Sequence, residues 1–375
     1  LNPVAQFLGI SPKQPNKIIF GFLPFWNMDQ ADNLRYHLLT HLAYFGLDYN
    51  PDGTIQTITD DRTTEPGWNK LSSQIASQIF RSAKSSNGKT VIVMRAMTQG
   101  LIESLVNNSK SRAKLIDSTM EIFETKNFDG INIDFEYIGT PDQRTKNNFS
   151  ILVGDLSSTC KQRHPGCEIS IDVFADSATK DRLWDYTQIT SHLDYIIIMA
   201  YDFFRSSSTQ AGPIAPLRGV CAKNQPSLPT CLEHDVAQTI ADFTKIIPAE
   251  KLILGVPYYG YEWQTTDSKF LSNTYQDSGS TATYKRIREL LESNQQPNSK
   301  ILGLQTNWND TTLTPWITYQ ENGKTQQIHY EDERSLSLKY DLVNQSNLGG
   351  IAIWALGYDG NWPQLWQLLQ RKFTR

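Results

Sequence analysis

The stretch FDGINIDFE, residues 128–136, is the most informative part of this sequence about its fold. On a β-strand, side chains alternate between two faces, so Asn132, Asp134 and Glu136 share one face and the apolar residues share the other. Burying two unpaired carboxyl groups about 7 Å apart costs several kcal/mol, and such a cost usually marks a working site. The apolar face predicts helices packed outside the strand, with the acids pointing into the space that the sheet encloses.

An exposed antiparallel strand is the ordinary alternative for an isolated D-x-E pattern. Here the pattern is longer, because Asp129-Gly130 precedes the alternation and an amphipathic segment precedes both. The run resembles the D-G-x-D-x-D-x-E signature of glycoside hydrolase family 18, the chitinase family, with Asn132 where the signature has Asp. Segments from Ile18 to Trp366 support the resemblance, which therefore covers nearly the whole chain.

Strand and helix patterns alternate along the chain. Short apolar runs predict eight strands, at residues 17–22, 41–47, 91–94, 128–136, 168–174, 193–202, 251–260 and 349–356. Apolar stripes at helical spacing predict helices between many of them, among others at residues 71–83, 113–123, 149–160 and 236–247. This alternation predicts a (β/α)8 TIM barrel, whose active site lies at the carboxyl ends of the strands.

One connection is too long for an ordinary loop, between the seventh and eighth strands. It contains a helical stripe around Ile287 and the dipeptide Asn322-Gly323, which favours a tight hairpin turn. We therefore predict a catalytic barrel of residues 1–260 and 331–375, with a small α+β insertion domain of residues 261–330 that raises one wall of the cleft. Residues 1–16 contain three prolines and are expected to be irregular.

Composition excludes several classes of partner. The 375 residues include 20% charged and 39% hydrophobic residues with a formal net charge of -4, which offers no basic field for nucleic acid. No apolar run approaches the roughly 18 residues that span a bilayer, and the start at Leu1 lacks the pattern of a signal peptide, so we expect that any such peptide was removed or never present. We expect a monomer without nucleic-acid or membrane partners.

The four cysteines fall into two close pairs, Cys160 with Cys167 and Cys221 with Cys231. Turn-forming residues lie between the members of each pair, which favours two small disulfide loops and secretion to the cell envelope or beyond it. A buried free thiol is the alternative for the first pair, because Cys160 continues the apolar stripe of a helix. Neither pair has the C-x-x-C spacing typical of zinc.

The resemblance implies a retaining reaction in which the 2-acetamido group of the substrate is the nucleophile. Glu136 is then the acid that protonates the leaving oxygen. Asp134 holds the acetamido N–H, balances the oxazolinium intermediate and, with partial desolvation, raises the pKa of Glu136. We expect Asn132 to donate a hydrogen bond to Asp134 and to favour its charged form. Asp129 is expected to give structural support.

Two further landmarks lie on later strands. Met199-x-Tyr201-Asp202 resembles the M-x-Y-D motif of the sixth strand in the family, which implies that Tyr201 donates to the acetamido carbonyl and Asp202 binds the distorted sugar. Pro257-Tyr258-Tyr259-Gly260 resembles a landmark of the seventh strand.

Aromatic residues complete the expected cleft. Trp354 is expected to form its floor, with barrel core as the alternative, and Tyr259 and Trp26 are expected to be subsite walls. The family often has a small S-x-G-G sequence at the end of the third strand, whereas this chain has Met94-Arg95-Ala96-Met97. The shape of that side of the cleft is therefore not given by the resemblance.

The resemblance implies a glycoside hydrolase that cleaves chitin or chitooligosaccharides and needs no cofactor. Peptidoglycan N-acetylglucosaminidase activity is an alternative, because Asn132 also resembles the spore-cortex and peptidoglycan branch of the family. A chitin-binding lectin is another, although members that lost catalysis typically lack the acid and Glu136 is present. An inhibitor that acts through the barrel exterior has no visible signature. We expect no metal at His37 and His41, because His41 opens a strand.

Overall fold

The computed structural model describes residues 14–221, 231–293 and 300–374. The irregular segment predicted for residues 1–16 lies almost wholly outside these ranges. Within them, every helix is too short or too polar to cross a membrane.

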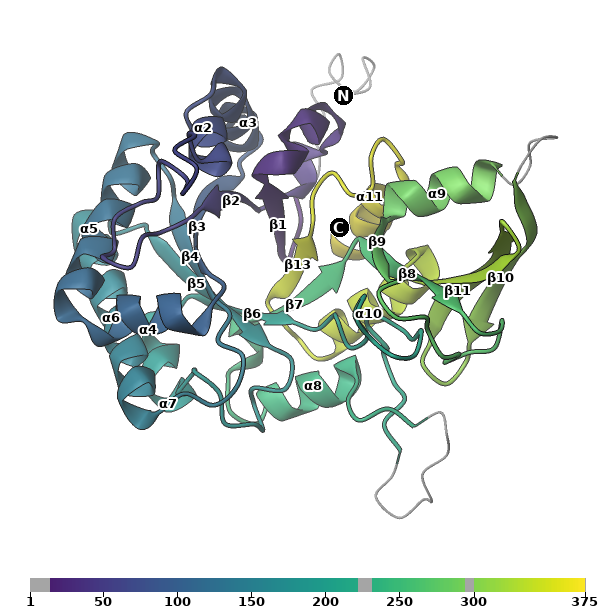
Figure 1. Cartoon of the computed structure of the whole chain (residues 1–375). Coiled ribbons are helices and arrows are strands. Elements are labelled where there is room, and N and C mark those ends of the chain that lie inside the picture. The colour runs from purple at the N-terminus through teal and green to yellow at the C-terminus, as the bar shows by residue number, and fades with distance from the viewer. Residues whose placement is uncertain (1–13, 222–230, 294–299, 375) are drawn as a thin grey trace.

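Eight parallel strands close into a barrel in the order β1-β13-β7-β6-β5-β4-β3-β2 (Figure 1). The prediction of a (β/α)8 barrel is confirmed. The strands are β1 (Ile18–Pro24), β2 (His41–Leu47), β3 (Lys89–Ala96), β4 (Gly130–Phe135), β5 (Glu168–Phe174), β6 (Tyr195–Met199), β7 (Leu252–Pro257) and β13 (Gly350–Trp354).

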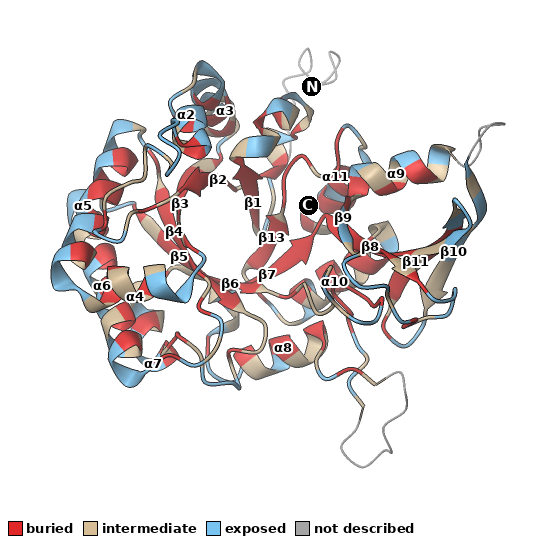
Figure 2. Ribbon diagram, viewed as in Figure 1, coloured by how far each residue is buried: buried red, intermediate tan, exposed pale blue. Residues whose placement is uncertain are grey.

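Helices surround the barrel and bury their apolar faces against it, while their outer faces are exposed (Figure 2). The α-helices around the barrel are α2 (Pro66–Leu71), α3 (Gln74–Ser85), α4 (Gln99–Asn107), α5 (Ser109–Thr125), α6 (Gln143–Arg163), α7 (Tyr186–Ile189), α8 (Val236–Phe243), α10 (Glu333–Gln345) and α11 (Gln364–Phe373). Short 3₁₀ turns are η1 (Phe25–Asn33), η2 (Tyr36–Leu38), η3 (Thr190–His192) and η4 (Ala249–Lys251).

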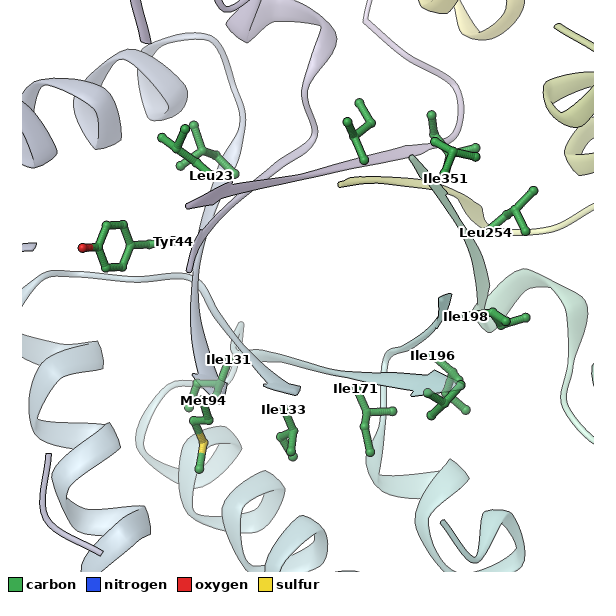
Figure 3. Close-up of a cluster of buried hydrophobic side chains, with 14 of the residues drawn as sticks. Leu23, Tyr44, Met94, Ile131, Ile133, Ile171, Ile196, Ile198, Leu254 and Ile351 are labelled. Atoms are coloured by element: carbon green, nitrogen blue, oxygen red, sulfur yellow. The ribbon is translucent and has the colours of Figure 1, made fainter. Parts of the chain in front are cut away.

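The outward faces of the strands form the main hydrophobic core. Ile131 and Ile133 of β4 and Ile171 of β5 point away from the barrel interior toward the helices (Figure 3). The alternation predicted from residues 128–136 therefore holds, and the polar positions of β4 are left facing inward.

The barrel interior has an apolar sector and a polar sector. Phe20, Phe22, Ala43, Phe45, Val91, Val93, Ile197, Ile253 and Ala352 form one buried cluster, which draws on every barrel strand except β4 and β5. The inward positions of β4 and β5 are instead buried polar residues, namely Asn132, Asp134, Ser170 and Asp172. The buried polar residues of the barrel interior therefore lie on these two strands.

The amino end of the barrel carries a second polar group. The Nε2 of His41 lies 2.8 Å from Oε2 of Glu168, and its Nδ1 lies 2.8 Å from Oγ1 of Thr40. Lys89 also pairs with Glu168. Although burial raises the pKa of Glu168, the hydrogen bonds from His41 and Lys89 lower it to about 2. His41 is thus held by a carboxylate and a hydroxyl, and the described ranges hold no cluster of three or more His, Cys, Asp or Glu suited to a metal.

The connection after β7 forms a separate five-stranded sheet beside the barrel, in the order β10-β11-β12-β8-β9 (Figure 1). Its first strand starts at Tyr259, two residues before the predicted boundary. Asn322 and Gly323 have φ of 53° and 73° and join β11 to β12 in the hairpin that this dipeptide predicts. The elements are β8 (Tyr259–Thr265), β9 (Ser280–Thr283), α9 (Tyr284–Ser293), β10 (Ile301–Asn309), β11 (Thr314–Glu321) and β12 (Lys324–His329).

Both predicted disulfides are present, Cys160–Cys167 and Cys221–Cys231. The first ties the end of α6 to the residue before β5. The alternative of a buried free thiol at Cys160 is therefore wrong.

Candidate active site

A cavity of about 260 Å³ opens at the carboxyl end of the barrel. Its wall includes Tyr261 and Thr281 of the insertion, so the insertion does raise one side. Seven of the predicted site residues line it, namely Asp134, Glu136, Met199, Tyr201, Asp202, Tyr259 and Trp354. Trp26 is not among the lining residues, and its ring is 45% exposed and packs edge-on against Phe45.

Asp134 lies on β4 and is almost fully buried. Burial raises its pKa well above the usual range, the charges of Asp172 and Glu136 add to this, and Arg95 opposes it. Within the described ranges its Oδ1 has no hydrogen-bond partner. A buried acceptor without a partner is costly, so this oxygen is available to an N–H group of a ligand.

Glu136 is the first residue after β4, and its backbone N–H donates to the carbonyl of Ala96 at 2.9 Å. Burial raises the pKa of its carboxyl; Arg205 opposes the shift and Asp202 adds to it. The direction of this shift agrees with the prediction, but the neighbouring carboxyl that contributes to it is Asp202, where the sequence predicted Asp134. A raised pKa favours the protonated form of the carboxyl, which a general acid requires.

The prediction for Asn132 is wrong. Its Nδ2 donates to Oγ of Ser170 and to Oδ1 of Asp172, both at 3.0 Å, and not to Asp134. The reason is the strand register, because the Cα partner of Asn132 is Ser170 on β5. The expected bias of Asp134 toward its charged form is wrong as well, since burial and neighbouring carboxyls raise its pKa.

Asp202 adopts a left-handed backbone conformation with φ of 61° just after β6. Its Oδ1 accepts hydrogen bonds from the hydroxyl groups of Tyr259 at 2.5 Å and Tyr261 at 3.1 Å. Burial raises the pKa of Asp202 and these hydrogen bonds lower it. Tyr259 therefore lines the cavity and also orients this carboxyl.

Tyr201, which follows β6, and Trp354, at the end of β13, both line the cavity. Burial, with neighbouring carboxyls, raises the pKa of Tyr201 well above its usual value, so its hydroxyl remains a donor. The ring of Trp354 packs against Phe45 and Phe22 with centroids 4.7 and 5.8 Å apart. The indole is thus fixed by barrel core on one side and open to the cavity on the other.

Two residues outside the cavity support it. Oδ2 of Asp129 accepts from the backbone N and Oγ1 of Thr90 at 2.8 and 3.0 Å, which joins β4 to β3. Arg95, in the segment that replaces the S-x-G-G sequence, is the register partner of Asp134 on β3. Its guanidinium makes two hydrogen bonds to Asp48, of 2.6 and 2.5 Å, and lies over the ring of Phe45.

A second cavity of about 410 Å³ adjoins the first and shares Met199, Tyr201 and Asp202 with it. Its other lining residues include Lys180, Arg182 and Arg205. Lys180 and Arg182 both pair with Asp176, and the lining also holds Glu233. The two cavities therefore meet at Met199, Tyr201 and Asp202.

Sequence reasoning missed Asp172, Arg205 and Tyr261. The signal for Asp172 was present, because Ser170 and Asp172 alternate with apolar residues on β5 as Asn132 and Asp134 do on β4. No comparable pattern marks Arg205 or Tyr261, which reach the site through a loop and the insertion.

Known proteins resemble this chain in sequence and in fold. The family model for glycosyl hydrolases family 18 matches residues 18–359. Probable chitinase 2 of Drosophila melanogaster is 27% identical over 68% of this chain and 52% of its own length. The cortical fragment-lytic enzyme of Bacillus subtilis is 25% identical over 93% of this chain and 71% of its own length.

A solved structure shows the same fold. The GH18 chitinase of Cycas revoluta in complex with (GlcNAc)3 superposes with a TM-score of 0.77, at 20% identity, over 95% of this chain and 99% of its own.

Proposed function

The chain belongs to glycosyl hydrolases family 18, and from this premise we propose that it is a retaining glycoside hydrolase that cleaves β-1,4-linked N-acetylglucosamine polymers, first among them chitin and chitooligosaccharides. The observation that carries the proposal is the position of Asp134 and Glu136 in one cavity at the carboxyl end of the barrel. One carboxyl with an open acceptor and one with a raised pKa are the two groups that substrate-assisted cleavage needs.

In the first step, Glu136 gives its proton to the glycosidic oxygen as the bond to C1 breaks. The acetamido oxygen of the same sugar bonds to C1, while Oδ1 of Asp134 accepts its N–H and balances the positive oxazolinium. Tyr201 donates to the acetamido oxygen, and Asp202 holds the sugar from the other side. Trp354 supplies the apolar floor.

In the second step, a water molecule attacks C1 and gives its proton to Glu136, which is then restored as the acid. The acetamido oxygen leaves C1, so two inversions give net retention. Proton transfer by a positioned carboxyl accounts for about 10²–10⁴ of the rate enhancement.

The dependence on an acetamido group tests the proposal. Chitooligosaccharides should be cleaved, whereas cello-oligosaccharides of the same length should not, because they lack the nucleophile. Reducing ends released from both at similar rates would overturn substrate assistance. Binding of chitooligosaccharides with no release of reducing ends would instead favour the lectin.

Peptidoglycan is a second candidate substrate. The Bacillus relative that aligns with 93% of this chain is a cortical fragment-lytic enzyme. The lining of the second cavity also includes the cations Lys180, Arg182 and Arg205, of which Lys180 and Arg182 pair with Asp176. Parallel digestion of chitooligosaccharides and purified peptidoglycan separates the two. The two disulfides support secretion to the cell envelope or beyond it.

A further inference from the structure

Asp172 has no part in the mechanism above, yet it is built into the same site. It is almost fully buried on β5, lines the cavity with Asp134 and Glu136, and accepts a hydrogen bond of 3.0 Å from Asn132. Asn132 in turn is anchored by Ser170 at 3.0 Å. An ordinary core position would hold an apolar side chain, as the inward positions of most other barrel strands do.

The site therefore holds two buried aspartates, Asp134 and Asp172, without a paired cation. Within the described ranges, no Lys, Arg or His nitrogen lies within 4.0 Å of either carboxyl. The cation whose charge reaches Asp134 is Arg95, whose Nε and Nη2 both donate hydrogen bonds to Asp48. Two buried carboxyls that interact cannot both ionise at ordinary cost, so one of them retains a proton.

The groups that face this pair come from three other segments. Glu136 follows β4, Arg95 lies on β3, and Tyr201 and Asp202 follow β6. Of these, only Arg95 favours a charged carboxyl at Asp134; Glu136 disfavours it. At Asp172 burial raises the pKa, the hydrogen bond from Asn132 lowers it, and Glu136 raises it.

The family signature has a second carboxyl at position 132, on β4, where this chain has an amide. We propose that Asp172 is a positioning residue that supplies this second carboxyl from β5. The two aspartates share one proton, which lies on Asp134 while the hydrogen bond from Asn132 stabilises a charged Asp172, and which passes to Asp172 when the oxazolinium needs a charged Asp134. The inference rests on the proposed function and deepens it, because it assigns the partner that sets the charge of Asp134. The pair gains and loses no proton during the cycle. The shared proton only moves from an oxygen of one aspartate to an oxygen of the other.

Exchanging the amide of Asn132 with the acid of Asp172 tests whether Asp172 supplies the second carboxyl. The enzymes to compare are the unmodified protein, Asp172→Asn, Asn132→Asp, and the double exchange Asn132→Asp with Asp172→Asn. For each, the pH dependence of kcat/KM on a chitooligosaccharide is measured, and thermal unfolding confirms that the variant is folded.

The acidic limb of the pH profile of kcat/KM should move in opposite directions in the two single variants. Asp172→Asn removes a negative neighbour of Asp134 and should move the limb down by about one pH unit or more, and Asn132→Asp adds one and should move it up. The double exchange should return the limb close to that of the unmodified protein. A merely structural Asp172 would lower kcat in the variants without this reversal of sign, and superimposable acidic limbs in all four would overturn the inference.

An infrared titration gives a readout that does not depend on activity. In the Glu136→Gln background without substrate, the carbonyl band of a protonated buried carboxyl should be present near neutral pH. Other buried carboxyls, such as Glu331 and Asp359, contribute to the same band because burial raises their pKa values to about 7. The intensity of the band should therefore fall by one carboxyl with Asp172→Asn and be regained in the double exchange, and an unchanged band with Asp172→Asn would overturn the inference. If no acetamido sugar polymer is cleaved, the proposed function fails while this titration still decides the role of Asp172.

Discussion

Strand β5 carries an acid near each end of the barrel, Glu168 and Asp172, and the surroundings shift the pKa values of the two in opposite directions. At the amino end, hydrogen bonds from His41 and Lys89 outweigh burial and lower the pKa of Glu168 to about 2. At the carboxyl end, Asp172 and its neighbours Asp134 and Glu136 have raised pKa values because burial is not offset by a paired cation. A satisfied carboxylate stabilises the fold, whereas unsatisfied carboxyls retain protons and acceptor positions for chemistry.

A Glu→Gln substitution at each end of the barrel should give the largest expected difference in kcat. Glu136→Gln should lower kcat by about 10²–10⁴-fold, because it removes the acid proton but keeps the shape of the side chain. Oligosaccharide binding, followed by calorimetry, should survive. Glu168→Gln is the matched control, and its kcat should change far less. If Glu136→Gln kept more than about a tenth of the rate, the assignment of the acid would be wrong.

The free energy of unfolding should respond in the reverse order, with a larger loss in Glu168→Gln than in Glu136→Gln. Because the folded pKa of Glu168 is below its unfolded value of 4.5, its contribution is fully present above that pH and is lost as pH falls toward about 2. At about 1.4 kcal/mol per pKa unit this shift corresponds to somewhat more than 3 kcal/mol before solvent screening of this partly exposed group, so Glu168→Gln should remove roughly 2–3 kcal/mol at pH 7. Urea unfolding at pH 7 checks this, and Glu136→Gln should leave the free energy of unfolding unchanged or higher. Equal losses in the two variants would show that the two ends do not differ.

A smaller effect is expected within the carboxyl end. Tyr259→Phe removes the 2.5 Å hydrogen bond to Asp202, and kcat/KM should fall about tenfold. Tyr261→Phe removes the longer bond of 3.1 Å and should have a lesser effect. Steady-state kinetics on one chitooligosaccharide compares the two variants. Identical rates in both variants and the unmodified protein would mean that these hydrogen bonds to Asp202 do not contribute to catalysis.

The barrel and the acids of β4 were predictable because their signals are local. Alternation in residues 128–136 fixes which side chains face inward, and helical stripes fix what covers the outside. The partner of Asn132 was not predictable from the same pattern, because it depends on which residue of β5 lies opposite, and parallel register is set by packing around the whole barrel. Arg205 reaches the site through a loop that carries no periodic pattern.

The anomeric form of the first product is the strongest test of a retaining reaction at Asp134 and Glu136. The carboxyl end holds two buried aspartates besides Glu136, and either would invert the product if it acted as a base on water. Proton NMR of the first product of chitooligosaccharide cleavage, recorded before mutarotation, distinguishes the outcomes. We expect the β-anomer, formed through the acetamido group with Asp134 as its partner. An initial α-anomer would rule out substrate-assisted cleavage.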